Sequence, residues 1–587
     1  MEQQKQALID IRFKNRLKVV KSIFFMLLLL VFINLFKLQV IQRDLKRQGG
    51  PWVKVVSPVP RGTIYDRNGQ VLAMSVPYCS VYLDSWAISE KEKDEKTYKE
   101  RLKKELQETL GLQEKQINKY LSLKYPLIEK ELSLNKYKEL ESKNLPGIVF
   151  EQRYKRVYPN NRFACHVIGF TGTDEEGLEG IELYYNSILK GMKGVSLILK
   201  DGKGALIPSV EKKLVEPEKG KDIKLTLDYK LQFIVEEELE KCYAQYNAKS
   251  ASAVIMNYEN GEILALANYP NYDLNFFKKA NPAERRNRIV TDLFEPGSTF
   301  KIITVTAAME EKLIAPEDTV FCENGRWFVR NHFLRDTHSY GHLTVREVLE
   351  KSSNIGTVKI AMKLGESRLY DYCNKFGFGQ LTGIDLPGEV RGILRPLNRW
   401  SGYSITAIPI GQEVGTTAIQ GIVAMGVTAN GGYLVKPHIL KEIQDKSADI
   451  KTLYNQQREQ ILSEKTCTTL TNILENVTKP GGTAPKANID GYRISGKTGT
   501  AQKSINGRYS KNQYVASFCG YINGTEEKLV IMVTVDEPRP IYYGGLVAAP
   551  TFKNILWRSL QYFKIPPHQE YNNNKIVLNK KEPVIKE

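Results

Sequence analysis

The sequence predicts an α+β protein, because strand patterns, a block of helical patterns and further strand patterns follow one another between about residues 225 and 565. This order is typical of a mostly antiparallel sheet flanked by helices. The chain has 587 residues, 42% hydrophobic and 26% charged, so it can bury a large core and is not globally disordered. At about 150 residues per domain, its length predicts three or four domains.

The N-terminal region predicts a transmembrane anchor at residues 19–41. Residues 22–36 carry no charge, and although a span needs about 20 residues, flanking lysines can extend to the interface. A cleaved signal peptide is the alternative, but the charged segment that follows lacks a small-residue cleavage site. Basic residues are more numerous before the span than after it. This predicts a cytoplasmic tail at 1–18, and a single-pass protein with the rest of the chain on the outer face of the cell membrane.

The formal net charge is +18. For a chain outside the cytoplasm, this charge favours a membrane surface or an anionic cell-surface polymer, and no nucleic-acid partner is expected. The seven cysteines include no C-x-x-C pair, so we expect buried free thiols rather than a disulfide framework. His332, His338 and His342 do not form a metal-binding pattern, since Gly341 argues against a shared helix. No metal or other cofactor is predicted.

The segments are predicted in chain order. Residues 42–224 form an elongated mixed α+β pedestal, with a hairpin turning at Asn68-Gly69 and an amphipathic helical insertion at about 88–145. A second domain covers 225–565, and a disordered tail covers 566–587. The second domain is expected to contain a strand and helix from residue 224, a hairpin turning at Asn260-Gly261, helices from Ser298, Val345 and Ser463, strands at 492–502, 514–522 and 529–535, and a helix at about 552–563.

Ser298-Thr299-Phe300-Lys301 is the first of three motifs with chemical meaning. It follows a Pro-Gly turn and begins a helical pattern, which places Ser298 near a helix N-terminus where developing negative charge is stabilised. Residues i and i+3 share one face of a helix, so a deprotonated Lys301 could take the serine proton. Alone, S-x-x-K also fits an ordinary capped helix with an exposed lysine.

The other two motifs are Ser352-Ser353-Asn354 and Lys497-Thr498-Gly499-Thr500. The first is by itself a helix N-cap cluster. The second reads as a strand whose glycine lets a substrate backbone approach closely. Ser352 follows Ser298 by 54 residues and Lys497 follows Ser352 by 145, so all three motifs fall in one predicted domain.

With this order of motifs, the sequence resembles the penicillin-recognising serine acyltransferases. The resemblance extends to PRGTIYDRNGQVLA, GLEGIELYYN, TDLFEPGSTFK and ISGKTGTAQ, and covers roughly residues 50–565. These segments are similar to the class B penicillin-binding proteins, which are membrane-anchored peptidoglycan D,D-transpeptidases with a dimerisation pedestal. TDLFEPGSTFK resembles the septal branch, which acts in division or sporulation. Sporulation-type members often carry a further C-terminal module, and its absence after about residue 565 favours the division enzyme.

The resemblance implies a role for each matching residue. Ser298 is the nucleophile that a D-Ala-D-Ala stem peptide or a β-lactam acylates, and Lys301 is the general base. Ser352 relays protons and Asn354 holds a substrate amide. Lys497 supplies positive charge, the hydroxyls of Thr498 and Thr500 bind the substrate carboxylate, and the N–H groups of Ser298 and Thr500 form the oxyanion hole beside Gly499. A SEDS-family glycosyltransferase and other divisome proteins are the implied partners.

One position departs from the family pattern, and three other functions compete. Glu413 stands where a small residue is expected, which makes the local shape of its loop uncertain. A serine β-lactamase or a D,D-carboxypeptidase uses similar motifs, but the surroundings of Glu366 do not match those of a deacylating glutamate. A non-catalytic division scaffold is the alternative of another class, and the intact motifs argue against it.

Overall fold

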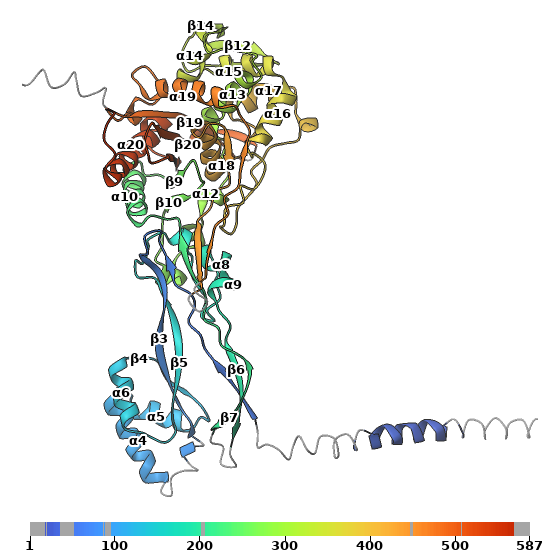
Figure 1. Ribbon diagram of the computed structural model, residues 1–587, viewed down its shortest axis with the longest axis vertical. Helices are drawn as coiled ribbons and strands as arrows, with labels where there is room; N and C mark the ends of the chain where they lie inside the picture. Colours follow the sequence, from blue (N-terminus) through green and yellow to red (C-terminus); the bar gives the residue numbers. More distant parts are fainter. Residues whose placement is uncertain are drawn as a thin grey trace, which may run out of the picture. The chain divides into compact units, whose positions relative to one another are not determined.

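The computed structural model describes residues 18, 20–33, 35, 52–85, 87–88, 95–200, 206–445, 450–505 and 507–568 (Figure 1). The chain divides into two compact units. The first unit draws on Met1–Val59, Pro77–Tyr154 and Met192–Lys219, and the second on Pro60–Val76, Lys155–Gly191 and Gly220–Glu587. Each unit therefore contains segments that are distant in the sequence.

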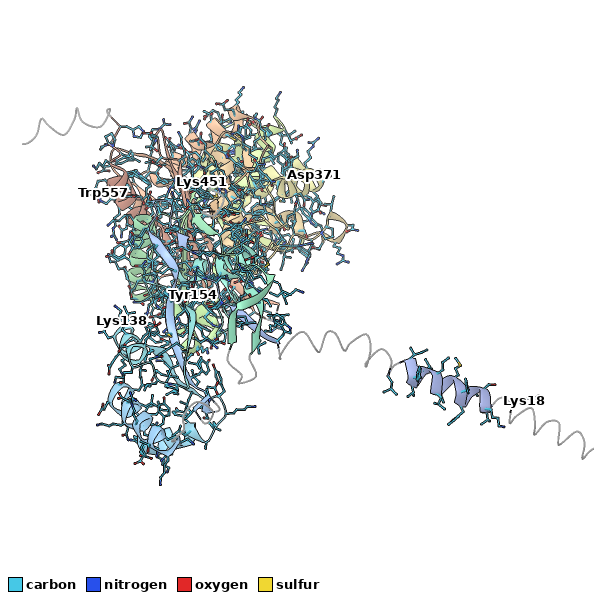
Figure 2. The ribbon with its side chains drawn as sticks, turned by 60° about the horizontal axis from the view of Figure 1, so that its bottom comes forward. Lys18, Lys138, Tyr154, Asp371, Lys451 and Trp557 are labelled. Atoms are coloured by element: carbon cyan, nitrogen blue, oxygen red, sulfur yellow. The ribbon has the colours of Figure 1, made fainter. Side chains whose placement is uncertain are left out.

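The predicted anchor at 19–41 lies only partly within the described residues. Residues 20–33 and 35 are helical, and their large apolar side chains, drawn in Figure 2, are exposed. None of the helices in the described ranges is long and apolar enough to cross a membrane. Most of the predicted tails, residues 1–17 and 569–587, lie outside the described residues.

The first unit has a small core of its own. Helix α4 (Glu95–Leu110) buries Leu102 and Leu106 against side chains such as Leu140 of α6. Within the described residues, the helical insertion expected at about 88–145 contains helices, and it also contains a strand, β4, that the sequence pattern did not predict. The elements of this unit are β1 (Trp52–Ser57), β6 (Gly194–Lys200) and β7 (Leu206–Val215) in an antiparallel sheet, β4 (Leu127–Leu132), α5 (Glu114–Leu121) and α6 (Leu134–Ser142), with parts of β3 (Val71–Leu83) and β5 (Ile148–Val157).

A five-stranded antiparallel sheet forms the centre of the second unit, in the order β10-β9-β21-β20-β19. Asn260-Gly261 makes the predicted turn between β9 and β10, and Gly261 has a φ of +77°, a conformation that favours glycine. The strands are β9 (Ser250–Asn257), β10 (Ile263–Tyr269), β19 (Arg493–Ile505), β20 (Arg508–Asn523) and β21 (Leu529–Asp536).

Helices cover both faces of this sheet (Figure 1). Phe518 on β20 packs its ring against Phe552 of α20 (Gly544–Phe563), which lies beside α10 (Tyr229–Gln245). The residue after Phe518 on β20 faces the opposite side of the sheet. Its cross-strand partner on β21, Met532, packs against Gly421 of α18 (Ala418–Ala429). The expected sheet flanked by helices is thus confirmed. Helix α20 begins at Gly544, earlier than the predicted residue 552.

The remaining elements of the second unit surround this three-layered core. The predicted hairpin at Asn68-Gly69 joins β2 to β3, and β2 also pairs with β8. The elements are β2 (Ile64–Tyr65), α7 (Cys165–Ile168), α8 (Gly180–Tyr184), α9 (Asn186–Leu189), β8 (Asp222–Leu225), α11 (Pro282–Arg285), α12 (Arg288–Thr291), α13 (Lys301–Glu310), β11 (Thr319–Phe321), β12 (Arg326–Val329), β13 (His332–Arg335), β14 (His342–Thr344), α14 (Val345–Glu350), α15 (Asn354–Leu364), α16 (Glu366–Lys375), α17 (Ser404–Ala407), β15 (Tyr433–Val435), β16 (Leu440–Asp445), β17 (Ile450–Leu453), β18 (Arg458–Gln460) and α19 (Glu464–Thr478), with short 3₁₀ turns.

All seven cysteines lie in the described ranges, and all are free thiols. Six are buried and Cys79 is half-buried. The expectation of packed free thiols is therefore confirmed, with Cys79 the most exposed of the set.

Candidate active site

A cleft of about 750 Å³ brings the three motifs together within the second unit. Five of the eight predicted site residues line it: Ser298, Ser352, Asn354, Thr498 and Thr500. Lys301 and Lys497 are fully buried, and Gly499 packs behind the cleft wall. Residues that are far apart in the sequence thus form one site.

A tight turn places Ser298 at the start of a helical segment. Gly297 has a φ of +55°, and its N–H donates to the carbonyl oxygen of Gly411 at 3.1 Å. A Cβ on Gly411 would lie 2.2 Å from the carbonyl oxygen of Gly297, so this approach requires glycine. A 3₁₀ turn (Gly297–Phe300) then leads into α13, which confirms the predicted helix N-terminus at Ser298.

Lys301 lies on the first turn of α13 with a completely buried side chain. Its Nζ donates to the carbonyl oxygen of Ser352 at 2.5 Å and to Ser352 Oγ at 3.1 Å. Its pKa is lowered well below the usual range for lysine, first by burial and then by the charge of Lys497. A lysine in this environment can be neutral and accept a proton. Its hydrogen bonds in the described residues reach Ser352 rather than Ser298.

The second motif forms the N-terminus of α15. Ser353 is the N-cap, as the sequence suggested, and accepts from the N–H of Gly356 at 2.9 Å. Ser352 has a φ of +60°, a strained conformation for a residue other than glycine. The side-chain amide of Asn354 donates to the carbonyl oxygen of Arg335 at 2.8 Å, which fixes its orientation at the cleft.

Sequence reasoning missed Asp336, whose carboxylate holds this second motif in place. It accepts from Ser353 Oγ at 2.7 Å and from the backbone N–H groups of Asn354 and Ile355. Its negative charge also raises the pKa of Lys301, which opposes the larger lowering by burial and by the charge of Lys497. No spacing rule connects Asp336 to a motif 16 residues further along the chain.

The third motif lies on β19, an edge strand of the sheet, so one side of its backbone remains open for a ligand. Thr500 Oγ1 accepts from the N–H of Gly544 at 3.0 Å. The hydroxyls of Thr498 and Thr483 lie 3.1 Å apart. Thr483 also lines the cleft, and no sequence pattern had marked it.

Lys497, the first residue of the third motif, is completely buried. Its expected role as a cation beside the substrate carboxylate stays a prediction. In the free protein its Nζ is buried and has no hydrogen-bond partner in the described residues, so burial lowers its pKa to about 7. Burial therefore disfavours the charged form of Lys497, and a neighbouring anion favours it.

Gly499 packs closely against other parts of the second unit. A Cβ at this position would lie 2.3 Å from Ser517 Oγ, 2.9 Å from the carbonyl oxygen of Pro296 and 3.2 Å from Thr299 Cγ2. The glycine therefore allows the nucleophile turn to pack against β19. The expected close approach of a substrate backbone at this strand stays a prediction.

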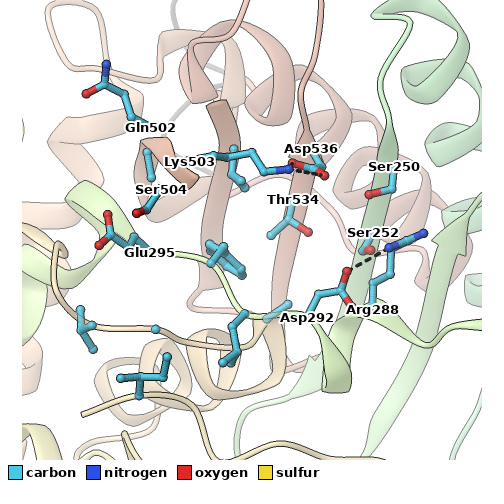
Figure 3. Close-up of a pocket in the computed structure, with 18 of the residues that line it drawn as sticks. Ser250, Ser252, Arg288, Asp292, Glu295, Gln502, Lys503, Ser504, Thr534 and Asp536 are labelled. Atoms are coloured by element: carbon cyan, nitrogen blue, oxygen red, sulfur yellow. Dashed lines mark hydrogen bonds and ion pairs between the residues drawn. The ribbon is translucent and has the colours of Figure 1, made fainter. Parts of the chain in front are cut away.

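A second cavity, of about 480 Å³, adjoins the nucleophile turn and shares Glu295 with the cleft (Figure 3). Two ion pairs border it, Arg288–Asp292 at 2.9 Å and Lys503–Asp536 at 2.8 Å. Because these charges are already paired within the protein, the cavity by itself indicates no ligand.

The unusual Glu413 helps to build this region. Its φ is +58°, in the left-handed region, so the small residue expected from the family pattern is the one this backbone favours. Its N–H donates to Glu295 Oε1 at 3.0 Å, and its carboxylate accepts from Ser404 Oγ at 2.8 Å. The other oxygen of Glu295 is buried and has no hydrogen-bond partner in the part of the chain that the structure describes. Burial raises the pKa of Glu295, with a smaller contribution from Glu413.

Comparisons with known proteins agree with this geometry. Residues 251–557 match the penicillin-binding protein transpeptidase domain family, and residues 56–225 match the penicillin-binding protein dimerisation domain family. The chain is 36% identical over 531 residues to stage V sporulation protein D of Bacillus subtilis, covering 88% of this chain and 81% of that protein. It is 30% identical over 555 residues to the peptidoglycan D,D-transpeptidase FtsI of Escherichia coli, covering 93% and 92% of the two chains.

Solved structures agree as well. Penicillin-binding protein 3 of Mycobacterium tuberculosis, in complex with aztreonam, aligns with a TM-score of 0.67 and 26% identity, covering 88% of this chain and 99% of that chain. The motifs meet in one cleft, and both family domains are present in order. The chain belongs to the class B penicillin-binding proteins and is a serine-type peptidoglycan D,D-transpeptidase.

Proposed function

We propose that Ser298 carries the acyl group between two stem peptides. Its Oγ attacks the carbonyl carbon of the penultimate D-Ala, and its proton passes to the neutral Nζ of Lys301. The peptide C–N bond breaks, and the terminal D-Ala leaves with that proton on its amine. The amine of a second stem peptide then attacks the ester carbon and gives up a proton, the C–O bond to Ser298 breaks, and the hydroxyl is restored.

The shared cleft and the buried lysine pair are the observations that carry this proposal. Lys301 contacts Ser352 Oγ, so Ser352 provides a short proton path between Lys301 and the leaving amine. Asn354 holds a backbone amide of the substrate. The N–H groups of Ser298 and Thr500 stabilise the oxyanion, with about 3 kcal/mol for each donor by analogy with serine proteases.

The substrate carboxylate is bound by Lys497, Thr498 and Thr500 in this mechanism. The Nζ of Lys497 has no hydrogen-bond partner within the described ranges, so an anion beside it supplies a counter-charge and keeps the lysine protonated. A β-lactam carries a carboxylate at the corresponding place. It therefore enters the same cleft and acylates the same serine.

We also propose that the protein is anchored in the cell membrane by residues 19–41, with a cytoplasmic N-terminus, and that it acts in septal wall synthesis. The uncharged run at 22–36 and the basic residues before it support the anchor. The relative named for sporulation and the TDLFEPGSTFK segment support the septal role. Glycan polymerisation then requires another membrane protein, for which a SEDS-family glycosyltransferase and other divisome proteins are the proposed partners.

Intact-mass spectrometry of the purified protein after treatment with a penicillin tests the central step. We expect one adduct, which peptide mapping places on Ser298 and which Ser298→Ala abolishes. An adduct on another residue would overturn the assignment of the nucleophile. A fluorescent fusion followed through growth and sporulation tests the septal role, and uniform labelling of the cell periphery at both stages would contradict it.

A further inference from the structure

The hairpin β12–β13 presents an unusual outer face. The register pairs Arg326 with Arg335 and Phe328 with Phe333. The side chains of these four residues are exposed, whereas Trp327, Val329 and Leu334 on the other face pack against the core. We call the outer set, completed by Arg330 at the turn, the hairpin face; its members are Arg326, Phe328, Arg330, Phe333 and Arg335.

Three features of the hairpin face are unfavourable for an isolated hairpin. Two like charges stand directly opposite each other, which destabilises a strand pair. Phe328 and Phe333 are 60% and 50% exposed, with ring centroids 5.0 Å apart. Arg330 has a φ of +47° in a turn where glycine or asparagine is preferred. Strain of this kind is tolerated most often where a surface has a function.

The arginines of the hairpin face form no ion pairs within the described part of the chain. Among the described residues, no carboxylate forms an ion pair with Arg326, Arg330 or Arg335; Arg326 instead lies over the ring of Phe333, 4.1 Å from its centroid. The face therefore offers three guanidinium groups around two rings. Its complement is a ligand with several carboxylates and flat apolar surfaces.

The hairpin is joined directly to the catalytic cleft. The carbonyl oxygen of Arg335 accepts from the amide of Asn354, and the next residue, Asp336, holds the second motif. Thr337 and His338, which follow, line the cleft. The segment that follows the hairpin therefore forms part of the wall of the cleft that contains Ser298.

We propose that the hairpin face binds the peptidoglycan strand whose stem peptides are cross-linked in the cleft. This inference rests on the proposed function, since peptidoglycan joins amino-sugar rings to peptides that bear carboxylates. The apolar sides of the sugar rings pack on Phe328 and Phe333, and the stem-peptide carboxylates pair with the three arginines. The positive charge of the hairpin face favours a peptidoglycan strand with carboxylates over a neutral protein surface.

The test measures binding of the full chain in detergent to teichoic-acid-free peptidoglycan sacculi by co-sedimentation. Two double variants should each weaken binding about tenfold, because each loses ring packing or carboxylate pairing with the strand. These variants are Phe328→Ala/Phe333→Ala and Arg326→Gln/Arg330→Gln. The matched control is Phe276→Ala/Arg399→Gln, which changes an exposed phenylalanine and an exposed arginine elsewhere in the second unit and should bind like wild type. Sacculi with amidated carboxylates should also bind weakly.

Penicillin acylation of the same variants separates this inference from the proposed function. No member of the hairpin face lines the cleft, so the acylation rates of these variants with a small β-lactam should stay within about twofold of wild type. If the wild-type protein is acylated but the hairpin variants bind sacculi like wild type, the inference is overturned and the proposed function stands. Binding only to walls that contain teichoic acid, or no binding to sacculi at all, also overturns it, whereas failure of wild-type acylation overturns the proposed function.

Discussion

Two buried lysines of the candidate active site have different expected roles. Lys301 contacts Ser352 and has a pKa lowered by burial and by Lys497, whereas the Nζ of Lys497 has no hydrogen-bond partner among the described residues. Neither state can be read from the sequence, because both depend on burial and on neighbours from other segments. The identity of the two residues was predictable from the motifs, and the protonation of Lys497 was not.

The first prediction separates the base from the cation. Lys301→Arg keeps a positive charge but cannot accept a proton at neutral pH, so acylation by penicillin should fall by about 100-fold or more. Lys497→Arg keeps the charge that its task requires and should lose less. Stopped-flow acylation with one penicillin measures both. Equal rates for the two variants would show that Lys301 is not the base.

The second prediction concerns pH. Lys497 must be protonated to bind a carboxylate, and its pKa is about 7 in the free protein, so binding should weaken as the pH rises through that value. Lys301 must be deprotonated, and because burial and the charge of Lys497 lower its pKa, it loses its proton at a lower pH than an ordinary lysine does. The second-order acylation rate should therefore rise with pH as Lys301 loses its proton and decline on the alkaline side as Lys497 loses its own.

Acylation rates from about pH 5 to about pH 9 give this profile. A penicillin methyl ester is the control, because without the carboxylate it should not show the decline on the alkaline side. If the acylation rates of penicillin and of its methyl ester decline equally at alkaline pH, Lys497 is not the residue that binds the carboxylate.

At the scale of single elements, local signals predicted much of the fold. The Asn-Gly turns at 68–69 and 260–261, and the helices from Ser298, Val345 and Ser463, are present. The start of α20 was missed because its first turn contains Gly544 and Gly545 and its interior contains Pro550, which usually end a helix. In the native fold, burial of this helix against the sheet outweighs those preferences.

The third prediction tests the packing role of Gly499 in β19. Gly499→Ala places a methyl group against Ser517, Pro296 and Thr299, which should destabilise the protein by about 1–3 kcal/mol and displace the nucleophile turn. Acylation should slow by at least about tenfold. Gly402→Ala, in open space, is the matched control. If Gly499→Ala acylates like wild type, the close packing is not required.

The fourth prediction uses the strained loop at Glu413. Glu413→Gly and Glu413→Ala both remove the carboxylate that accepts from Ser404, but only alanine keeps a Cβ at a φ of +58°. The glycine variant should therefore be more stable by about 1 kcal/mol. Chemical denaturation of the two variants measures the difference. Equal stabilities would mean that the loop relaxes away from this conformation.

For the whole molecule, the class of fold could be predicted but the composition of its units could not. The motifs and their order predicted one catalytic domain, and the cleft that gathers Ser298, Ser352 and Thr500 bears this out. The division of the chain interleaves Pro60–Val76 and Lys155–Gly191 with Gly220–Glu587. The contacts that hold these segments in one unit join residues more than a hundred positions apart, as in the buried ion pair Arg61–Glu182 at 2.6 Å. Local sequence periodicity cannot predict contacts of this kind.

The last prediction follows from the separate hydrophobic cores in the described parts of the two units. Leu106 on α4 and Ile303 on α13 are both buried, one in each core. Removing either side chain should lower the free energy of unfolding of its own unit by about 2–5 kcal/mol. Because the cleft is built entirely from the second unit, only Ile303→Ala should also slow acylation of Ser298, while Leu106→Ala should acylate like wild type below its melting temperature. Thermal unfolding and the penicillin acylation rate, measured on the same preparations, decide this. A large loss of acylation in folded Leu106→Ala would show that the first unit controls the cleft, and would assign it a regulatory role in place of a purely structural one.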